Sequence, residues 1–280
     1  MKILVPIKRV ADPQNANKVN VSEDGQHVTT DGLEWMINPF DEWSLEAALR
    51  LTENAAQKSR VGEVVAVTIG PKEAESTLRR ETLARGAERG VLVEGDDEAL
   101  DATQVAAVLA ALVAKETPDL VLMGKQVVDG DSNVVPHLLG EQLGWPVVNY
   151  AQSIVTDDDG KTLTLQRETD VGIVTVKVTG PAVITCADRI LLPTSVKNGV
   201  TPDDFAYPQQ EGARYAGLKG LRDMKKKPVE VLVSTDLGVE IEPSVSYRRF
   251  RLPPARSGST AYVDSVEELV EKLRTEAKAI

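Results

Sequence analysis

Short runs of Val, Ile and Leu alternate with helical segments through the first two thirds of the chain, and this alternation constrains the fold more than any other feature. The sequence predicts strands at residues 3–7, 64–69, 90–93 and 120–123, and helices at 41–54, 72–85 and 102–115. Continuous apolar runs of this length, separated by helices, are typical of a parallel sheet covered on both faces. With right-handed crossovers, they predict an α/β protein with a Rossmann-like, doubly wound and mainly parallel sheet.

The pattern changes after Pro146, where the spacing of apolar residues becomes typical of antiparallel strands. We expect these strands at 153–155, 162–167 and 174–178, with a hairpin turn at 157–160 and a buried strand at 182–185. Regular periodicity is absent from 188–227, which we interpret as a long loop before a last strand at 229–233. A loop of this length in a compact protein is usually functional or disordered.

The chain ends with a Pro- and Arg-rich arm at 244–258, followed by an amphipathic helix. Ser265 and Glu268 have the spacing of a capping box at the start of this helix. One face of the helix carries the apolar residues Val266, Leu269, Val270 and Leu273. The arm and helix either pack on a partner or fold back on their own domain, and the pattern alone favours neither.

Residues 119–133 carry the most information about function. The strand at 120–123 leads into Gly124-Lys125-Gln126, then into an acidic glycine turn and a helix at 134–143 that Gly144 closes. A strand, a glycine turn and a helix start direct backbone N–H groups and the positive end of a helix dipole at one point, which suits a phosphate. The spacing matches neither the Walker pattern nor GxGxxG, so the motif alone is a weak nucleotide signal.

The composition narrows the possible functions. The chain has 280 residues and a net charge of −11, which argues against nucleic acid or an anionic membrane as its main partner. Its single cysteine, Cys186, excludes an internal disulfide and a cysteine-ligated cluster. His27 and His137 are isolated, so neither is expected to bind a metal or act as a general base. Apolar runs are too short for a membrane span or a signal peptide, and we expect a cytoplasmic protein without membrane insertion.

Several motifs, taken together and in order, resemble the β-subunit family of electron transfer flavoproteins (ETF). The resemblance spans nearly the whole chain. It rests on Ile3-Leu4-Val5-Pro6-Ile7-Lys8-Arg9-Val10 with Asp12, Asn38-Pro39-Phe40-Asp41, Ala87-Glu88-Arg89-Gly90, Gly124-Lys125-Gln126 with Asp129, Asp131 and Asn133, and Arg214-Tyr215-Ala216-Gly217-Leu218 before a lysine cluster.

The resemblance implies an adenine-nucleotide α-hydrolase-like fold and a heterodimer with an ETF α subunit. The α subunit would hold most of the FAD, and this subunit would cover the flavin and bury one structural AMP. The pair would relay single electrons from flavin dehydrogenases, such as acyl-CoA dehydrogenases, to an ETF:quinone oxidoreductase type of acceptor. This subunit would then be an electron carrier without catalytic residues of its own.

The resemblance also assigns roles to parts of the chain. Residues 1–187 plus 228–243 would form the nucleotide-binding domain, 188–227 the recognition loop, and 244–280 an arm and helix that pack on the partner subunit. Tyr215 and Leu218 would contact the dehydrogenase, with Leu218 as the inserted anchor, and Phe40 would lie nearest the flavin. The expected cofactor-binding residues are Pro6, Asn38, Pro39, Phe40, Asp41, Ile69, Gly70, Gly124, Lys125, Gln126, Val127, Val128, Asp129, Gly130, Asp131, Ser132, Asn133, Val134 and Val135.

The chemistry of these positions fits such roles. The ends of the first, second and fourth strands converge where an open α/β sheet binds its ligand. The Asn38 carboxamide can both donate to and accept from an adenine or ribose edge. The side chains of Asp129 and Asp131 have the wrong charge to face a phosphate, so we expect them to turn or cap the loop. Backbone amides at 129–133 are therefore the expected phosphate ligands.

The chain departs from the family pattern at four places. Val134-Val135-Pro136 replaces polar residues that family members commonly offer the phosphate, so amides and Asn133 are expected to bind it. Pro13 stands where some members place an aromatic residue beside the flavin, and Asp170-Val171-Gly172 matches the acidic signature of the family only in part. Residues 188–212 are longer than their counterpart, so the loop and the partner dehydrogenase could both differ.

Other functions stay open. Asp129-Gly130-Asp131 resembles the electron-bifurcating branch, in which a second FAD replaces AMP, whereas Lys125 and Asn133 resemble the AMP-binding branch, which we favour. An adenine-nucleotide-hydrolysing or adenylylating enzyme would need a Gly/Ser-rich phosphate loop after the first strand, where this chain has Lys8-Arg9-Val10-Ala11-Asp12-Pro13. A homodimeric nucleotide-sensing module is opposed by the C-terminal arm and the long loop.

Overall fold

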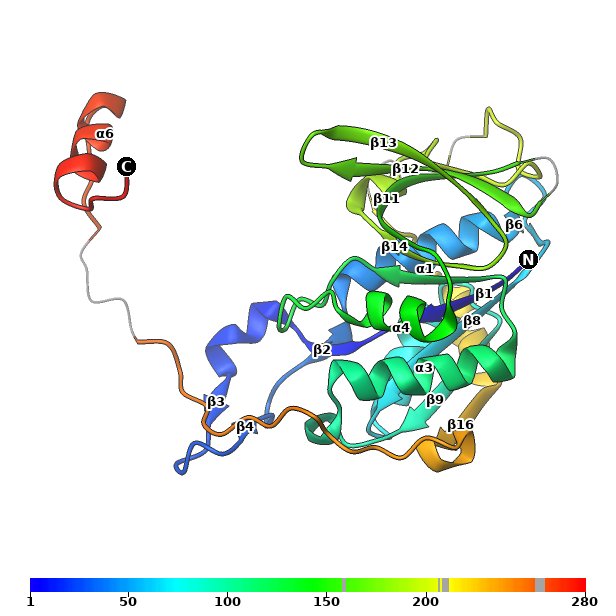
Figure 1. The fold of residues 1–280 in the computed structure, drawn as a ribbon, viewed down its shortest axis with the longest axis horizontal. Helices are drawn as coiled ribbons and strands as arrows, with labels where there is room; N and C mark the ends of the chain where they lie inside the picture. Colours follow the sequence, from blue (N-terminus) through cyan, green and yellow to red (C-terminus); the bar gives the residue numbers. More distant parts are fainter. Residues whose placement is uncertain (158–159, 206, 208–211, 255–259) are drawn as a thin grey trace. The chain divides into compact units, whose positions relative to one another are not determined.

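A computed structural model describes residues 1–157, 160–205, 207, 212–254 and 260–280 of the chain (Figure 1). Its contacts divide the chain into two units, one formed by Met1–Val19 with Thr30–Tyr247 and the other by Asn20–Thr29 with Arg248–Ile280. Within the described residues, no helix is long and apolar enough to cross a membrane.

The first unit is organised around one large sheet, whose strand order is β13-β12-β11-β14-β10-β1-β8-β9-β16, with the short β15 paired to β11. The strands are β1 (Lys2–Pro6), β8 (Glu63–Gly70), β9 (Arg89–Glu94), β10 (Leu120–Gly124), β11 (Val147–Thr156), β12 (Thr162–Thr169), β13 (Gly172–Thr179), β14 (Ala182–Cys186), β15 (Val196–Lys197) and β16 (Val229–Val233). Pairing is parallel from β11 through β14, β10, β1, β8 and β9 to β16. It is antiparallel between β11 and β12 and between β12 and β13. The predicted parallel sheet with an antiparallel hairpin is therefore confirmed.

Helices cover both faces of this sheet, as a doubly wound fold requires. They are α1 (Pro39–Leu51), α2 (Ala74–Thr77), the π-helical turn η2 (Leu78–Leu83), α3 (Ala102–Glu116) and α4 (Val135–Leu143). A short helix, α5 (Leu218–Asp223), rests on Ala84 after η2. Ile3 and Val5 of β1 belong to a core on the face of α1 and η2. Leu4, between them, belongs to a second core with α3 and α4. This alternation follows from the two-residue period of a strand.

The structure differs from the sequence predictions in four segments. The helix expected at 41–54 ends at Leu51, and β6 (Glu53–Asn54) then pairs with β7 (Ser59–Arg60). The single helix expected at 72–85 is divided into α2 and η2. Residues 188–227 are not one loop, because they contain the 3-10 turn η4 (Asp188–Leu191), β15, α5 and the 3-10 turn η5 (Met224–Lys226). Residues before α1, for which no element was predicted after the first strand, form antiparallel pairs of β2 (Arg9–Ala11) with β5 (Trp35–Ile37) and of β3 (Asn20–Val21) with β4 (Val28–Thr29).

The second unit contains the terminal helix α6 (Val266–Thr275). The Ser265 hydroxyl accepts a hydrogen bond from the Glu268 backbone N–H at 3.1 Å, as the predicted cap requires. The Glu268 carboxylate accepts from the Asp264 N–H at 3.0 Å, one residue before the donor expected in a capping box. None of the α6 residues is buried, and its predicted apolar face remains accessible, with Val266 72% exposed.

Close packing between α4 and β11 generates a stability prediction. A Cβ atom on Gly140 would lie 2.1 Å from Val147 Cγ2 and 3.2 Å from the Trp145 carbonyl oxygen. Gly140→Ala should therefore lower the free energy of unfolding by about 1–3 kcal/mol, measured by urea denaturation. Gly217→Ala is the control, because a Cβ atom there would meet nothing within 4 Å. Its free energy of unfolding should change by less than about 0.5 kcal/mol. Equal stability of the two variants would contradict the packing described.

Candidate functional site

The predicted crevice residues gather where three neighbouring parallel strands end. Pro6, Gly70 and Gly124 are the last residues of β1, β8 and β10, and β1 lies between the other two. This edge is where open α/β sheets bind ligands. Helix α1 begins at Pro39, directly after Asn38, and its first turn packs against the end of β10. We call this arrangement of strand ends, the start of α1 and residues 125–135 the crevice.

Asn38 connects three segments of the crevice through its hydrogen bonds. The side chain is fully buried. Its Nδ2 donates to the Gln126 carbonyl oxygen at 2.9 Å, and its Oδ1 accepts from the Val128 N–H at 3.1 Å. The Asn38 backbone N–H donates to the Lys8 carbonyl oxygen at 2.8 Å. The carboxamide therefore shapes the loop after β10, and it also hydrogen-bonds the Asp41 side chain.

Asp41 is the second buried polar residue at the start of α1. Its Oδ2 accepts a hydrogen bond from the Lys8 N–H at 2.8 Å. A Cβ atom on Gly124 would lie 2.4 Å from Asp41 Oδ1 and 2.7 Å from the Phe40 carbonyl carbon, so only glycine permits this approach. Burial raises the pKa of Asp41 to about 7, although hydrogen bonds from Lys8, Asn38 and Gly124 oppose the rise.

Acidic side chains of the loop after β10 help to fix its conformation. Asp129 Oδ2 pairs with Lys8 Nζ at 2.6 Å, and Asp131 Oδ1 accepts from Gln126 Nε2 at 3.2 Å. Asp131 has a φ of 51°, in the left-handed region. The Val127 N–H donates to the Ser132 carbonyl oxygen at 3.0 Å. These contacts agree with the expectation that both aspartates shape the loop.

The end of this loop leads into α4 without a side-chain cap. Val134 is the N-cap residue, and no side chain accepts from the first turn of the helix. Asn133, predicted as a ligand, donates from Nδ2 to the Tyr150 hydroxyl at 3.1 Å. Pro136 has no N–H, and the His137 N–H donates to the Val134 carbonyl oxygen at 3.1 Å, so an anion at this helix start would bind the N–H groups of Val134 and Val135.

Aromatic rings lie beside the crevice. Phe40 and Trp43 pack edge to face, with ring centroids 5.0 Å apart, and Lys125 Nζ lies 5.4 Å from each centroid. Sequence reasoning missed a second group. The Arg9 guanidinium stacks on the Trp35 ring at 3.9 Å and pairs with Asp97 at 3.1 Å, beside Gly70. An Arg guanidinium can stack on a Trp ring, so the two residue types were a signal for this contact. Their separation along the chain concealed it.

Residues 214–227, which we call the docking segment, contain the predicted contact residues Tyr215 and Leu218. These side chains are 84% and 89% exposed. Leu218 starts α5, which corrects the expectation that it lies on a loop. A Cβ atom on Gly220 would lie 2.0 Å from the Ala84 carbonyl oxygen, so α5 rests directly on the residue after η2. The segment therefore has a defined conformation.

The docking segment is also fixed at both ends by guanidinium groups. Arg214 pairs with Glu46 at 2.8 Å and with Glu53 at 2.6 Å. Burial alone would raise the pKa of Glu46, but the hydrogen bond and charge of Arg214 and the charge of Arg50 hold that pKa below its ordinary value. At the other end, Arg79 donates to the carbonyl oxygens of residues 224 and 227, each at 3.0 Å.

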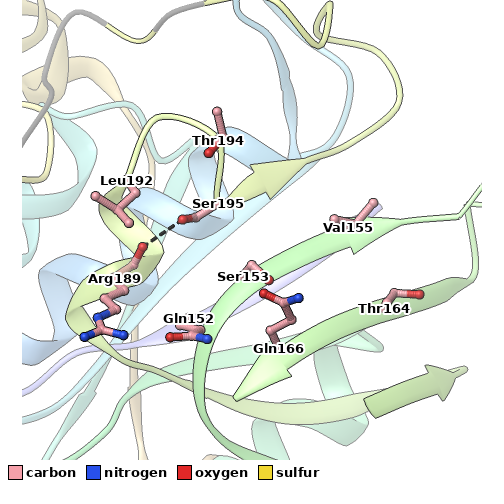
Figure 2. Close-up of a pocket in the computed structure, with 9 residues that line it drawn as sticks. All are labelled: Gln152, Ser153, Val155, Thr164, Gln166, Arg189, Leu192, Thr194 and Ser195. Atoms are coloured by element: carbon pink, nitrogen blue, oxygen red, sulfur yellow. Dashed lines mark hydrogen bonds between the residues drawn. The ribbon is translucent and has the colours of Figure 1, made fainter. Parts of the chain in front are cut away.

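A separate hollow of about 430 Å³ lies among β11, β12 and the segment from η4 to β15 (Figure 2). Gln152 is buried there, and its Oε1 has no hydrogen-bond partner among the described residues. The hollow shares no residue with the crevice, and sequence reasoning missed it, although a Gln inside an apolar strand was a signal. Its lining residues are Gln152, Ser153, Val155, Thr164, Gln166, Arg189, Leu192, Thr194 and Ser195.

The buried Asp41 carboxyl generates a prediction about pH. Its pKa is raised in the folded protein, from 3.8 to about 7, so the contribution of Asp41 to the free energy of unfolding should fall as pH rises from 4 to 7 and then level off. A pKa shift of this size corresponds to about 4 kcal/mol of unfolding free energy. Asp41→Asn should remove this dependence, measured by urea unfolding from pH 4 to 9. The exposed Asp31→Asn is the control and should retain it. A wild-type slope in Asp41→Asn would contradict the assignment.

Comparisons with known proteins agree with this architecture. The electron transfer flavoprotein domain matches residues 26–237. The mitochondrial electron transfer flavoprotein subunit beta of Arabidopsis thaliana is 37% identical over 280 residues, covering 100% of both chains. The human subunit beta is 37% identical over 277 residues, covering 98% of this chain and 97% of its own. The subunit beta of Bradyrhizobium diazoefficiens is 36% identical over 277 residues and 99% of both chains. The chain therefore belongs to the electron transfer flavoprotein β-subunit family.

Proposed function

We propose that this chain pairs with an ETF α subunit, holds one AMP in the crevice and covers the FAD that the α subunit binds. The observation that carries the proposal is the double contact of Asn38 with Gln126 and Val128. It fixes the loop after β10 against the start of α1 at the strand ends. The backbone of this loop is thus held in place before a nucleotide binds.

The charges around the crevice support a phosphate. The two loop aspartates have partners of their own, because Asp129 pairs with Lys8 and Asp131 accepts from Gln126. Asp41, whose pKa is about 7, is partly protonated at neutral pH. The negative charge around the crevice is therefore smaller than the sequence indicates, and the amides of 129–135 are the proposed phosphate ligands.

The redox chemistry would belong to the flavin, which accepts and donates single electrons when bound. This chain would form one wall of the flavin site and orient the flavin. Phe40 is the proposed nearest residue to the flavin, and its edge-to-face contact with Trp43 holds the ring in place. The AMP would take no part in electron transfer and would stabilise the crevice as a ligand of the folded state.

The docking segment supports exchange with a flavin dehydrogenase of the acyl-CoA dehydrogenase type. Leu218 is 89% exposed on a segment held by Arg214 and Arg79. A projecting apolar side chain on a rigid support is typical of an interface anchor. The electrons would leave to an ETF:quinone oxidoreductase type of acceptor.

The terminal helix α6 supports the heterodimer. Val266, Leu269 and Val270 are 72%, 44% and 37% exposed, and they have the i, i+3, i+4 spacing of one helix face. We propose that the α subunit covers this face.

Reconstitution tests the proposed function. The chain is co-expressed with an ETF α subunit, and the product is purified and mixed with an acyl-CoA dehydrogenase and its acyl-CoA substrate. We expect a yellow heterodimer whose flavin absorbance bleaches under anaerobic conditions, because the flavin accepts electrons from the dehydrogenase. The α subunit purified alone is the control. A colourless product, or a yellow complex that the dehydrogenase does not reduce, would contradict the proposal.

An electron-bifurcating ETF is the second candidate, and the motif Asp129-Gly130-Asp131 is the observation that favours it. In that case a second FAD would occupy the crevice in place of AMP. The heterodimer would then also oxidise NADH, which the proposed electron carrier would not do.

A further inference from the structure

A second hollow lies beside the docking segment and has a volume of about 540 Å³. Its walls come from η2 and the residues after it on one side and from the docking segment on the other. Tyr215, Leu221 and Met224 give it an apolar surface, and Arg80 stands at its side without an ion pair among the described residues. The complete lining is Arg80, Glu81, Arg85, Tyr215, Ala216, Leu221 and Met224.

Ion pairs, a hydrogen bond and close packing hold the walls of this hollow. Arg85 pairs with Glu42 at 2.6 Å and with Glu81 at 2.5 Å, which fixes the η2 side. Arg79 donates to the Met224 carbonyl oxygen at 3.0 Å, and Gly220 lies against Ala84, which fixes the α5 side. A site that is formed before binding loses little conformational entropy when a partner occupies it.

The surface around the hollow is basic, although the chain has a net charge of −11. Arg80, Lys219, Lys225 and Lys226 are exposed there. None of these four has an ion pair within the described part of the chain. Opposite charges across an interface orient an encounter and accelerate association. The surface therefore selects a partner segment that is acidic.

We propose that the hollow receives a bulky apolar side chain from an acidic segment of the partner dehydrogenase. Docking would then be reciprocal, because Leu218 enters the dehydrogenase while the dehydrogenase fills the hollow between η2 and α5. The hollow is continuous with the exposed Tyr215, which lines it and lies three residues before Leu218. Met224 in the wall is flexible and polarisable, so the same hollow adapts to different dehydrogenases. The inference rests on the proposed function and adds a second contact to it.

Filling the hollow tests this inference. Ala216→Trp and the smaller Ala216→Leu are each prepared as the heterodimer and assayed with an acyl-CoA dehydrogenase and its acyl-CoA substrate. We expect the heterodimer concentration at half-maximal rate to rise about tenfold for Ala216→Trp and less for Ala216→Leu, with an unchanged maximal rate and FAD content. Ala56→Trp, at an exposed alanine outside the hollow, is the matched control and should match the wild type.

The charge of the surface is tested separately. Arg80→Glu should raise the half-saturating concentration several-fold at low salt and much less at high salt, because screening weakens exposed charges. Lys58→Glu makes the same change at an exposed turn outside the surface and should have no such effect. If Ala216→Trp lowers the yield of heterodimer, Arg80→Glu still tests whether the hollow is a docking site.

Leu218→Ala separates failure of this inference from failure of the proposed function. If Leu218→Ala weakens docking and the Ala216 and Arg80 variants do not, the hollow is not a docking site and the proposal is wrong. If Leu218→Ala has no effect either, the docking role itself fails. Light scattering tests another occupant, because pairing of two heterodimers that Ala216→Trp abolishes would assign the hollow to a second copy and overturn the proposal.

Discussion

The close approach of the start of α1 to the end of β10 is the constraint on which the crevice depends. Gly124 lacks the side chain that would collide with Asp41 and Phe40, and Asn38 bonds to the backbone of the loop that follows. Asp41 and Asn38 also bond to the backbone of Lys8, after β1. Two side chains and one glycine thus fix three segments that are far apart in the sequence. This arrangement buries the carboxyl group of Asp41, whose pKa is raised to about 7.

Helix α1 links the two regions with proposed functions. Its first turn shapes the crevice, and Glu46, further along, holds Arg214 at the start of the docking segment. Glu46 also pairs with Arg50 at 2.7 Å, and both side chains are buried. Buried ion pairs contribute little net stability, but removal of one partner leaves an uncompensated charge. The main role of this network is therefore to fix the positions from which Tyr215 and Leu218 project relative to α1.

The sequence predicted the parallel sheet, the antiparallel hairpin and α4 because continuous apolar runs and helix signals are local. It also predicted that Asn38 and residues 124–133 lie together, but not the hydrogen bonds of Asn38, because their partners are backbone atoms about 90 positions away. The stacking of Arg9 on Trp35 and the contact of Gly220 with Ala84 were missed because each joins residues that are not neighbours in the sequence. Helix α5 is short, with a glycine at position 220, so its periodicity was too weak to detect.

The nucleotide content of the heterodimer tests the central claim most directly, since the crevice is proposed to hold AMP. The purified complex with the α subunit is denatured, and the released nucleotides are identified and counted by mass spectrometry. We predict one AMP and one FAD for each heterodimer. Two FAD and no AMP would contradict it and assign the crevice to a second flavin, and one FAD with no second nucleotide would show that the crevice holds none.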